Sequence, residues 1–355
     1  MKFFKKLKKV PKLKGPNYNR DLSYKRIGFI SKILFLFSSI VSRVFFVKKI
    51  EEDLKIGKID KKSPILFYSN HQSHLDYLFE LKYIYKEFPT VQCLAGKNLD
   101  IFLIGTFFRH SNAVFVERGA NALSKEYMKT LEIKLTDLFN NSIPVGIYPE
   151  GGRSRTGVVA DFKSGAFVSF LRSIVYLNKD GFLVPGSILY DTPIESKSLL
   201  KENGKKKKDS FFKFLTTFNV IFNAGGAYYV GSGEPIRITP EQAAIHLNNI
   251  KDFLKYTKAK MLETLNIPVS CVYNLCLEEN KEIKEDEVYE VYIKLCKENN
   301  KKFFDRNDFK IVTESLIKKK VIIRDGDFIK KGDNFIFSEY VRNTVSVNLK
   351  TDQSL

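Results

Sequence analysis

The chain has 355 residues, of which 44% are hydrophobic, so it can bury one large core and a smaller second unit. Its four cysteines are sparse and none belongs to a Cys-x-x-Cys pair, which argues against a disulfide framework and favours reduced thiols. The formal net charge of +19 bears on partners rather than on the fold, and leaves nucleic acid, an anionic membrane surface and acidic soluble partners open.

Residues 1–50 are predicted to form a basic arm followed by an interfacial helix. The first 14 residues contain seven lysines and no acid, and an apolar segment follows at 27–47. Lys32 and Arg43 interrupt this segment, so the uncharged run 33–42 is too short to span a bilayer. No small-residue cleavage site follows, which argues against a cleaved signal peptide. We expect an amphipathic helix lying in an anionic membrane surface; the alternative is a helix packed on the main domain.

From residue 51 to 265 short apolar runs alternate with helical patterns. We expect strands at 65–68, 91–94, 113–116, 145–148, 184–190 and 228–230. We expect helices at 75–88, 99–108, 120–139 and 165–177. This alternation is typical of βαβ units, so the predicted fold is an α/β domain with a mostly parallel mixed sheet flanked by helices. Ligands of such sheets bind at the carboxyl ends of the strands.

Residues 266–355 differ in character and are predicted to form a small α+β unit. Helices are expected at 287–297 and 307–319, and short strands at 321–323, 327–329 and 335–337. This arrangement resembles a small winged helix. A polar insert at 197–209, with four lysines at 205–208, is expected to be a solvated loop.

A possible catalytic base lies in the segment Asn70-His71-Gln72-Ser73-His74-Leu75-Asp76, which follows the strand expected at 65–68. On a regular helix only residues three or four apart meet, so His71 and Asp76 would not face each other there. Across a turn that enters a helix, Asp76 can reach back to one imidazole nitrogen while the other accepts a proton. The strand-to-helix context permits such a turn, so a general base with an orienting carboxylate is one interpretation of the spacing. The alternative is an acid in the first helical turn, stabilised by the helix dipole.

Two other chemistries compete for the same residues. His71, His74 and Asp76 could bind zinc with His110 as a further ligand. No cysteine pair or second histidine cluster supports this, so we assign no metal site. A Gly-x-Ser-x-Gly elbow does not occur in the sequence, which argues against a serine hydrolase.

A possible phosphate-binding loop follows the strand expected at 145–148. Gly151 and Gly152 allow a tight turn and a close backbone approach, and Arg153 and Arg155 offer forked donors that suit a phosphate. Glu150 could anchor the turn or pair with an arginine. The alternative is a surface turn with solvated arginines. Two further cations could add positive charge to the site, Lys163 and Arg118.

These residues together resemble the glycerolipid acyltransferase superfamily over roughly residues 60–240. The loop Gly-Gly-Arg-Ser-Arg-Thr-Gly is similar to that of the glycerol-3-phosphate and dihydroxyacetone-phosphate acyltransferase branch. The four blocks that carry the resemblance are His71 to Asp76, Phe115-Val116-Glu117-Arg118, Glu150 to Gly157, and Val184-Pro185-Gly186-Ser187-Ile188-Leu189-Tyr190-Asp191.

The resemblance implies that His71, oriented by Asp76, deprotonates the 1-hydroxyl of glycerol 3-phosphate, and that the alkoxide attacks an acyl thioester. Acyl-coenzyme A or acyl carrier protein would be the co-substrate, with no metal or other cofactor. The product, 1-acylglycerol 3-phosphate, would enter phospholipid synthesis at the cytoplasmic face of the membrane. Residues implied to bind the acceptor phosphate are Arg118, Arg153, Arg155 and Lys163, and residues implied to support the motifs are Glu150, Gly151, Gly152 and Pro185.

Other functions stay open at this point. The acceptor could be dihydroxyacetone phosphate or 1-acylglycerol 3-phosphate instead. A catalytically inactive membrane scaffold would not need an intact set of motif residues. A nucleic-acid-binding protein is a remote alternative, because the helix expected at 307–319 carries Asp308 and Glu314 but no arginine, the side chain that specific base readout prefers. We therefore expect no nucleic acid as a partner.

Overall fold

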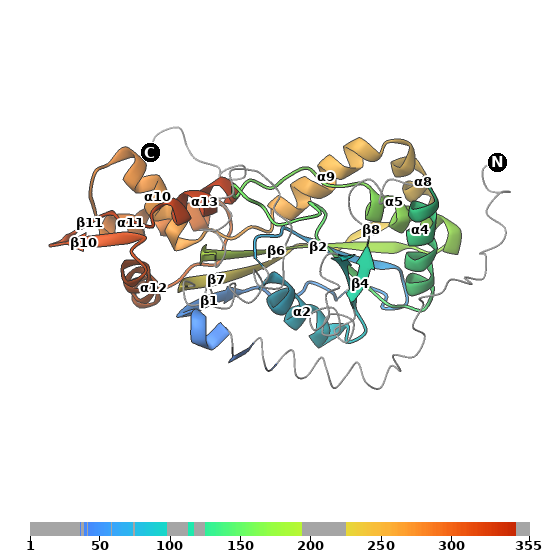
Figure 1. Cartoon of the computed structure of the whole chain (residues 1–355), viewed down its shortest axis with the longest axis horizontal. Helices are drawn as coiled ribbons and strands as arrows, with labels where there is room; N and C mark the ends of the chain where they lie inside the picture. The colour runs from blue at the N-terminus through green and yellow to red at the C-terminus, as the bar shows by residue number, and fades with distance from the viewer. Residues whose placement is uncertain are drawn as a thin grey trace.

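The structure is a computed structural model (Figure 1), and it describes residues 36, 39–40, 42–57, 59–73, 75–97, 113–116, 125–193 and 225–345. Several predicted features lie outside these residues: the lysine arm, the helix at 99–108, the polar insert at 197–209, and the side chains of His74, His110 and Arg118.

The described part of the chain is built around an eight-stranded mixed sheet with the order β1-β7-β6-β2-β5-β3-β4, in which β8 also pairs with β6. β6 pairs antiparallel with β7 and β8, and the other neighbours pair parallel. The predicted mostly parallel mixed sheet is thus confirmed. The strands are β1 (Lys48–Glu51), β2 (Ile65–Ser69), β3 (Gln92–Gly96), β4 (Ala113–Val116), β5 (Val145–Ile147), β6 (Gly181–Thr192), β7 (Gly225–Ser232) and β8 (Ile236–Ile238).

Helices cover both faces of this sheet (Figure 1). In β2, Leu66 and Tyr68 face one hydrophobic cluster while Ile65 and Phe67 face another, as the two-residue period of a strand requires. α2 (Asp76–Glu87) lies on the face of Ile65 and Phe67. The opposite side carries α4 (Lys125–Asn140), α5 (Gly165–Leu177), α8 (Pro240–Asn248) and α9 (Ile250–Leu262). Because β2 is buried on both faces, its sequence is a nearly continuous apolar run rather than an alternation of apolar and polar residues.

Local sequence explains several helix ends. α5 ends at Asn178, which adopts the left-handed conformation that asparagine tolerates better than most residues. α8 begins with Pro240 after Thr239, whose side chain forms a capping box with Gln242. Helical residues at Leu36 and near Val44 precede β1. The strand β1 itself was not predicted from the sequence. Among the helices in the described ranges, none is both long enough and apolar enough to cross a bilayer.

The C-terminal elements form a three-stranded sheet with the order β10-β11-β9 and four helices. The helices predicted at 287–297 and 307–319 are present, but the strand predicted at 335–337 is wrong. A helix begins there at Ile336, because buried positions continue at 337, 340, 341, 344 and 345 with a helical period. The elements are α10 (Val269–Glu279), β9 (Ile283–Lys284), α11 (Glu285–Glu298), α12 (Arg306–Lys318), β10 (Ile322–Asp325), β11 (Phe328–Lys331) and α13 (Ile336–Val345).

These C-terminal elements pack on the β6–β7 side of the sheet and share its main hydrophobic core. Asp191 of β6 connects the two parts. Its carboxylate accepts hydrogen bonds from the backbone of Ala227 in β7 at 2.7 Å, from Ser270 at the start of α10 at 2.8 Å, and from the Tyr229 hydroxyl at 3.1 Å. Burial raises the pKa of Asp191 to about 6. The predicted division of the chain at residue 265 therefore does not coincide with a break in the core.

Candidate active site

The first motif starts where β2 ends and is fastened to the neighbouring strand β6. The Asn70 amide donates to the Ile188 carbonyl and accepts from the Ile188 N–H, both at 2.9 Å. These paired bonds replace a backbone ladder where β2 stops, so the chain turns toward α2 at a defined place. His71 is the next residue and is thereby fixed at the carboxyl end of the central strand, where ligands of such sheets bind.

His71 and Asp76 form a buried dyad. Nδ1 of His71 lies 2.8 Å from Oδ2 of Asp76, and their side chains are 5% and 0% exposed. The N–H groups of Gln72 and Ser73 also donate to Oδ2, at 2.7 and 2.9 Å, and the Tyr190 hydroxyl donates to Oδ1 at 2.7 Å. Asp76 is the first residue of α2, so the helix dipole also favours its charge. The two interpretations of the sequence, an orienting carboxylate and an acid in the first helical turn, are therefore compatible. The helix N-terminus stabilises the same carboxylate that orients the imidazole.

Two tyrosines fix the plane of the His71 ring. Tyr148 stacks on it with centroids 4.3 Å apart and an interplanar angle of 20°. Tyr77 meets it edge-on at 5.2 Å and also contacts Tyr148 edge-on at 4.9 Å. With Nδ1 against Asp76 and the ring held between tyrosines, Nε2 is the nitrogen that can accept a proton. Sequence reasoning missed both tyrosines, although Tyr148 directly precedes the Pro149-Glu150 pair.

Glu150 joins the base to the loop with the two arginines. Its Oε1 accepts from the His71 backbone N–H at 3.1 Å and its Oε2 from Ala160 N–H at 2.8 Å, while Ser154 N–H donates to the His71 carbonyl at 2.8 Å. Burial raises the pKa of Glu150 to about 7, against the lowering effect of these two N–H donors and of Lys258. Glu150 thus anchors the turn, one of its two predicted roles.

The loop after Glu150 turns at Gly151, whose φ of +71° suits glycine. A Cβ on Gly151 would lie 2.4 Å from Nζ of Lys163, so the lysine side chain crosses directly over this glycine. The Lys163 N–H donates to the Pro149 carbonyl at 2.9 Å, which fixes the far end of the loop beside its start. Arg153 and Arg155 are both partly buried on this loop. The structure therefore brings Lys163, Gly151 and Glu150 together beside His71.

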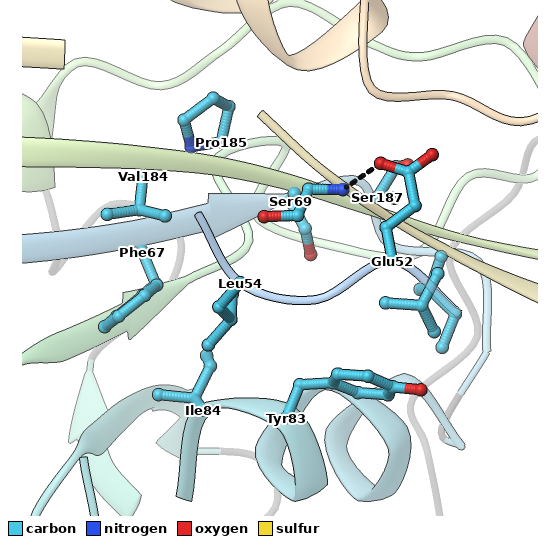
Figure 2. Close-up of a pocket in the computed structure, with 14 residues that line it drawn as sticks. Glu52, Leu54, Phe67, Ser69, Tyr83, Ile84, Val184, Pro185 and Ser187 are labelled. Carbon is cyan, nitrogen blue, oxygen red and sulfur yellow. Dashed lines mark hydrogen bonds between the residues drawn. The ribbon is translucent and has the colours of Figure 1, made fainter. Parts of the chain in front are cut away.

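Pro185 lies in β6 opposite Tyr68 of β2. On its other side β6 pairs with β8 up to Leu183 and with β7 from Gly186 onward, so the proline falls where the strand changes partner. A residue without an N–H is tolerated at such a position. Pro185 is one of the residues that line a mostly apolar pocket between α2, β2, β6 and β7, and Figure 2 shows Val184 and Phe67 of this lining on the side of α2. Ser69, two residues before His71, also lines this pocket.

A metal site finds no support in the described part of the chain, which contains no group of three His, Cys, Asp or Glu side chains that could hold an ion. His74 and His110, the histidines considered as further ligands, lie outside the described residues, as does Arg118. The residues that the structure does bring together are a buried His–Asp pair and a basic, glycine-containing loop beside it.

Comparisons with known proteins agree with this chemistry. Residues 50–188 match the family model described as Acyltransferase. The chain is 35% identical over 192 residues to a glycerol-3-phosphate acyltransferase from Alteromonas mediterranea, an alignment that covers 53% of this chain and 23% of that protein. A protein of the same name from Pseudoalteromonas atlantica is 35% identical over 179 residues, covering 49% of this chain and 22% of that protein. One from Pseudomonas putida (strain W619) is 29% identical over 240 residues, covering 63% and 27%.

The aligned part of the chain spans about a quarter of the length of these curated relatives. Among solved structures, the crystal structure of the 1-acyl-sn-glycerophosphate (LPA) acyltransferase PlsC from Thermotoga maritima aligns at 18% identity and a TM-score of 0.41, covering 66% of this chain and 82% of that one. The matched family region contains His71, Asp76 and the whole loop from Glu150 to Gly157. Residues 50–188 therefore match the acyltransferase family model, and the sequence around them is similar to bacterial glycerol-3-phosphate acyltransferases.

Proposed function

We propose that the protein transfers a fatty acyl group from an acyl thioester to the 1-hydroxyl of glycerol 3-phosphate, giving 1-acylglycerol 3-phosphate. The observation that carries this proposal is the His71–Asp76 pair at 2.8 Å, joined through Glu150 to a loop with Arg153 and Arg155. The names of the relatives that share this region support glycerol 3-phosphate as the acceptor.

The reaction proceeds without a covalent acyl-enzyme. Nε2 of His71 takes the proton of the acceptor hydroxyl as its oxygen attacks the thioester carbonyl, and the tetrahedral intermediate collapses with loss of the thiolate. The imidazolium then returns its proton to the thiolate, so charge and protons balance. Asp76 stabilises the imidazolium, and a base so placed contributes roughly 10²- to 10⁴-fold to the rate.

The acceptor phosphate is bound by Arg153, Arg155 and Lys163, with Arg118 expected to contribute. Arginine forks suit planar, bidentate recognition of a phosphate, whereas Lys163 adds a point charge over Gly151. The donor is acyl-coenzyme A or acyl carrier protein, and the net charge of +19 suits either anionic carrier.

We further propose that the protein binds peripherally to the cytoplasmic face of an anionic membrane. Leu36, Ile40 and Val44 are spaced four apart on one helical face and are 62%, 51% and 66% exposed. Phe46 holds this segment on the core through Tyr190 and other aromatic rings. An exposed apolar stripe, in a chain whose first 14 residues contain seven lysines, is suited to the boundary between headgroups and acyl chains.

The nucleic-acid alternative gains no support from the structure. α12, the expected recognition helix, packs against β7 and β1, and its Asp308 pairs with Lys48 of β1 at 2.5 Å. Glu314 of the same helix pairs with Arg324 at 2.6 Å. The helix begins at Arg306, one residue before its predicted start, but this arginine pairs with Asp286 and Glu290. These charged side chains of α12 are thus engaged within the chain, and the helix is used for packing on the sheet.

The deciding experiment measures thiol release from palmitoyl-coenzyme A by purified protein on anionic liposomes. Glycerol 3-phosphate, dihydroxyacetone phosphate and 1-acylglycerol 3-phosphate are offered separately, with His71→Ala as the control. We expect release that depends on glycerol 3-phosphate and on His71. Release with only one of the other acceptors would reassign the substrate. If acyl carrier protein as donor also gave no release with any acceptor, an acyltransferase function would be refuted.

A further inference from the structure

The C-terminal helix α13 lies against the loop that follows Glu150. The Tyr340 hydroxyl donates to the Ser154 carbonyl at 2.8 Å, the Asn343 amide to Thr156 at 3.0 Å, and the Thr344 hydroxyl to Gly157 at 2.6 Å. Positions 340, 343 and 344 share one face of a helix. Three carbonyls within four residues of the loop therefore receive donors from a helix that lies outside the matched family region of residues 50–188.

The Thr344 hydroxyl also contacts the histidine motif. Nε2 of Gln72 donates to Thr344 Oγ1 at 2.7 Å, and the Gln72 side chain is buried beside His71. Thr344 is 1% exposed. The Thr344 hydroxyl donates to the Gly157 carbonyl, and the Tyr340 carbonyl, at 3.4 Å, is a more distant acceptor. The Thr344 oxygen can therefore accept the Gln72 hydrogen bond through a lone pair. One hydroxyl therefore bridges the segment with the base and the segment with the arginines.

The backbones of the loop and the helix are in close contact at the same place. Gly157 has a φ of +87°, and a Cβ there would lie 1.8 Å from the Tyr340 carbonyl oxygen. α13 is itself held on α10 by the Asn274–Ser338 hydrogen bond at 3.0 Å and by the ion pair between Arg342 and Glu278. The loop between Glu150 and Gly157 is thus supported from outside by a helix with a firm attachment of its own.

We propose that α13 is a positioning element of the acyltransferase site, and that Thr344 sets the placement of the loop with Arg153 and Arg155 relative to His71. This inference rests on the proposed function, in which the loop binds the acceptor phosphate. Thr344 bonds to Gln72 and to the Gly157 carbonyl, so in this proposal its loss weakens acceptor binding through the loop. A shift of loop atoms of about 1 Å suffices for a large kinetic effect in a site of this kind.

The test compares Thr344→Val, which has nearly the same shape but no hydroxyl, with Thr344→Ser, which keeps the hydroxyl. With the acyl donor at saturation, we expect Thr344→Val to raise the KM for glycerol 3-phosphate about tenfold. The loss of the Thr344 hydrogen bonds would change an equilibrium constant by roughly this factor. The donor KM should stay unchanged and Thr344→Ser should restore most of the acceptor affinity. Asn343→Ala removes a donor near the surface and should shift the same parameter less. Glu339→Gln, on the exposed side of α13, is the matched control.

A second readout does not depend on turnover. Amide hydrogen exchange should be faster at Ser154, whose N–H donates to the His71 carbonyl, in Thr344→Val but not in Thr344→Ser. Unchanged acceptor KM and unchanged exchange in folded Thr344→Val and Asn343→Ala would overturn the inference, and so would a change confined to the donor KM. If the wild type shows no acceptor-dependent thiol release, the proposed function has failed, while exchange at Ser154 still decides whether α13 positions the loop.

Discussion

The backbone N–H of His71 donates to Oε1 of Glu150 at 3.1 Å, although the two residues are 79 positions apart in the chain. The other oxygen of the same carboxylate accepts from Ala160 at 2.8 Å. One buried acid therefore fixes the segment that carries the base and the loop that carries the arginines. In the proposed mechanism a base and a phosphate site must be held in a defined relation, so we expect this carboxylate to support catalysis without reacting itself.

Glu150→Gln should lower stability because an amide nitrogen cannot accept either backbone N–H. We expect a loss of about 1–3 kcal/mol in the free energy of unfolding near pH 5, the cost of one orphaned buried donor. The carboxyl can accept at both oxygens whether or not it is protonated, so the wild type has no such defect. Equal denaturant midpoints for the two proteins at pH 5 would contradict this expectation.

The difference in unfolding free energy between the wild type and Glu150→Gln should also depend on pH. Burial raises the pKa of Glu150 from 4.5 to about 7 in the folded state, so between these values the native protein holds a proton that the unfolded chain has lost. Stability of the wild type then falls as pH rises through this window, and the glutamine variant lacks this dependence. The difference in unfolding free energy should narrow by at most about 3 kcal/mol between pH 4.5 and 7. The buried Asp191 titrates in both proteins and cancels in the comparison.

Asp76→Asn should fold but lose activity. The asparagine oxygen can keep the bonds from His71, Gln72 and Ser73, and its nitrogen can donate to the Tyr190 oxygen. It carries no charge to stabilise the imidazolium, so we expect kcat to fall by about 10² or more. Circular dichroism checks the fold and thiol release at saturating substrates checks the rate. Full activity of this variant would remove Asp76 from the mechanism.

Tyr190→Phe separates orientation of the dyad from its charge. The variant removes the hydroxyl that donates to Oδ1 of Asp76 but keeps the aromatic packing against Phe46 and Phe79. We expect a stability loss of about 1–3 kcal/mol and a smaller fall in kcat than for Asp76→Asn, because Oδ2 keeps its contact with His71. A larger loss of kcat than in Asp76→Asn, measured side by side, would show that Tyr190 has a role beyond positioning.

Gly157→Ala should destabilise the protein much more than Gly152→Ala. A Cβ at Gly157 would meet the Tyr340 carbonyl oxygen at 1.8 Å, and its φ of +87° is unfavourable for alanine. At Gly152, no described atom outside its immediate neighbours lies within 4 Å of the added Cβ. We expect thermal unfolding to show a loss of about 2 kcal/mol or more for the first variant and about 0.5 kcal/mol or less for the second. Similar melting temperatures would contradict the close contact between the loop and α13.

The double variant Ile40→Ser with Val44→Ser should weaken membrane binding without harming the fold, since both side chains are exposed. If both insert into the apolar boundary, affinity for anionic vesicles should fall at least about tenfold in co-sedimentation. Ile245→Ser, at a side chain that is 65% exposed on α8, is the matched control and should bind like the wild type. Equal binding of all three proteins would refute the proposed interfacial stripe.

Much of the fold could be predicted from local pattern. The strand at 113–116 and the helix at 165–177 have the predicted bounds, because their apolar residues repeat with the right period and turn residues flank them. β1, β8 and β9 were missed; each has four residues or fewer and exists through pairing with a strand distant in the chain. The strand predicted at 335–337 was wrong because three apolar residues fit either period.

The sequence by itself determined the chemistry of the site, because His71, Asp76, Glu150 and the two arginines are reactive or charged types at motif spacing. Only the tertiary structure decided what surrounds them. The stacking of Tyr148 on His71, the Tyr190 bond to Asp76, and the Thr344 bridge to Gln72 across 272 residues are contacts between segments that meet only in the folded chain. Local propensity and periodicity carry no information on such pairs, since their energy depends on the packing of whole elements against one another.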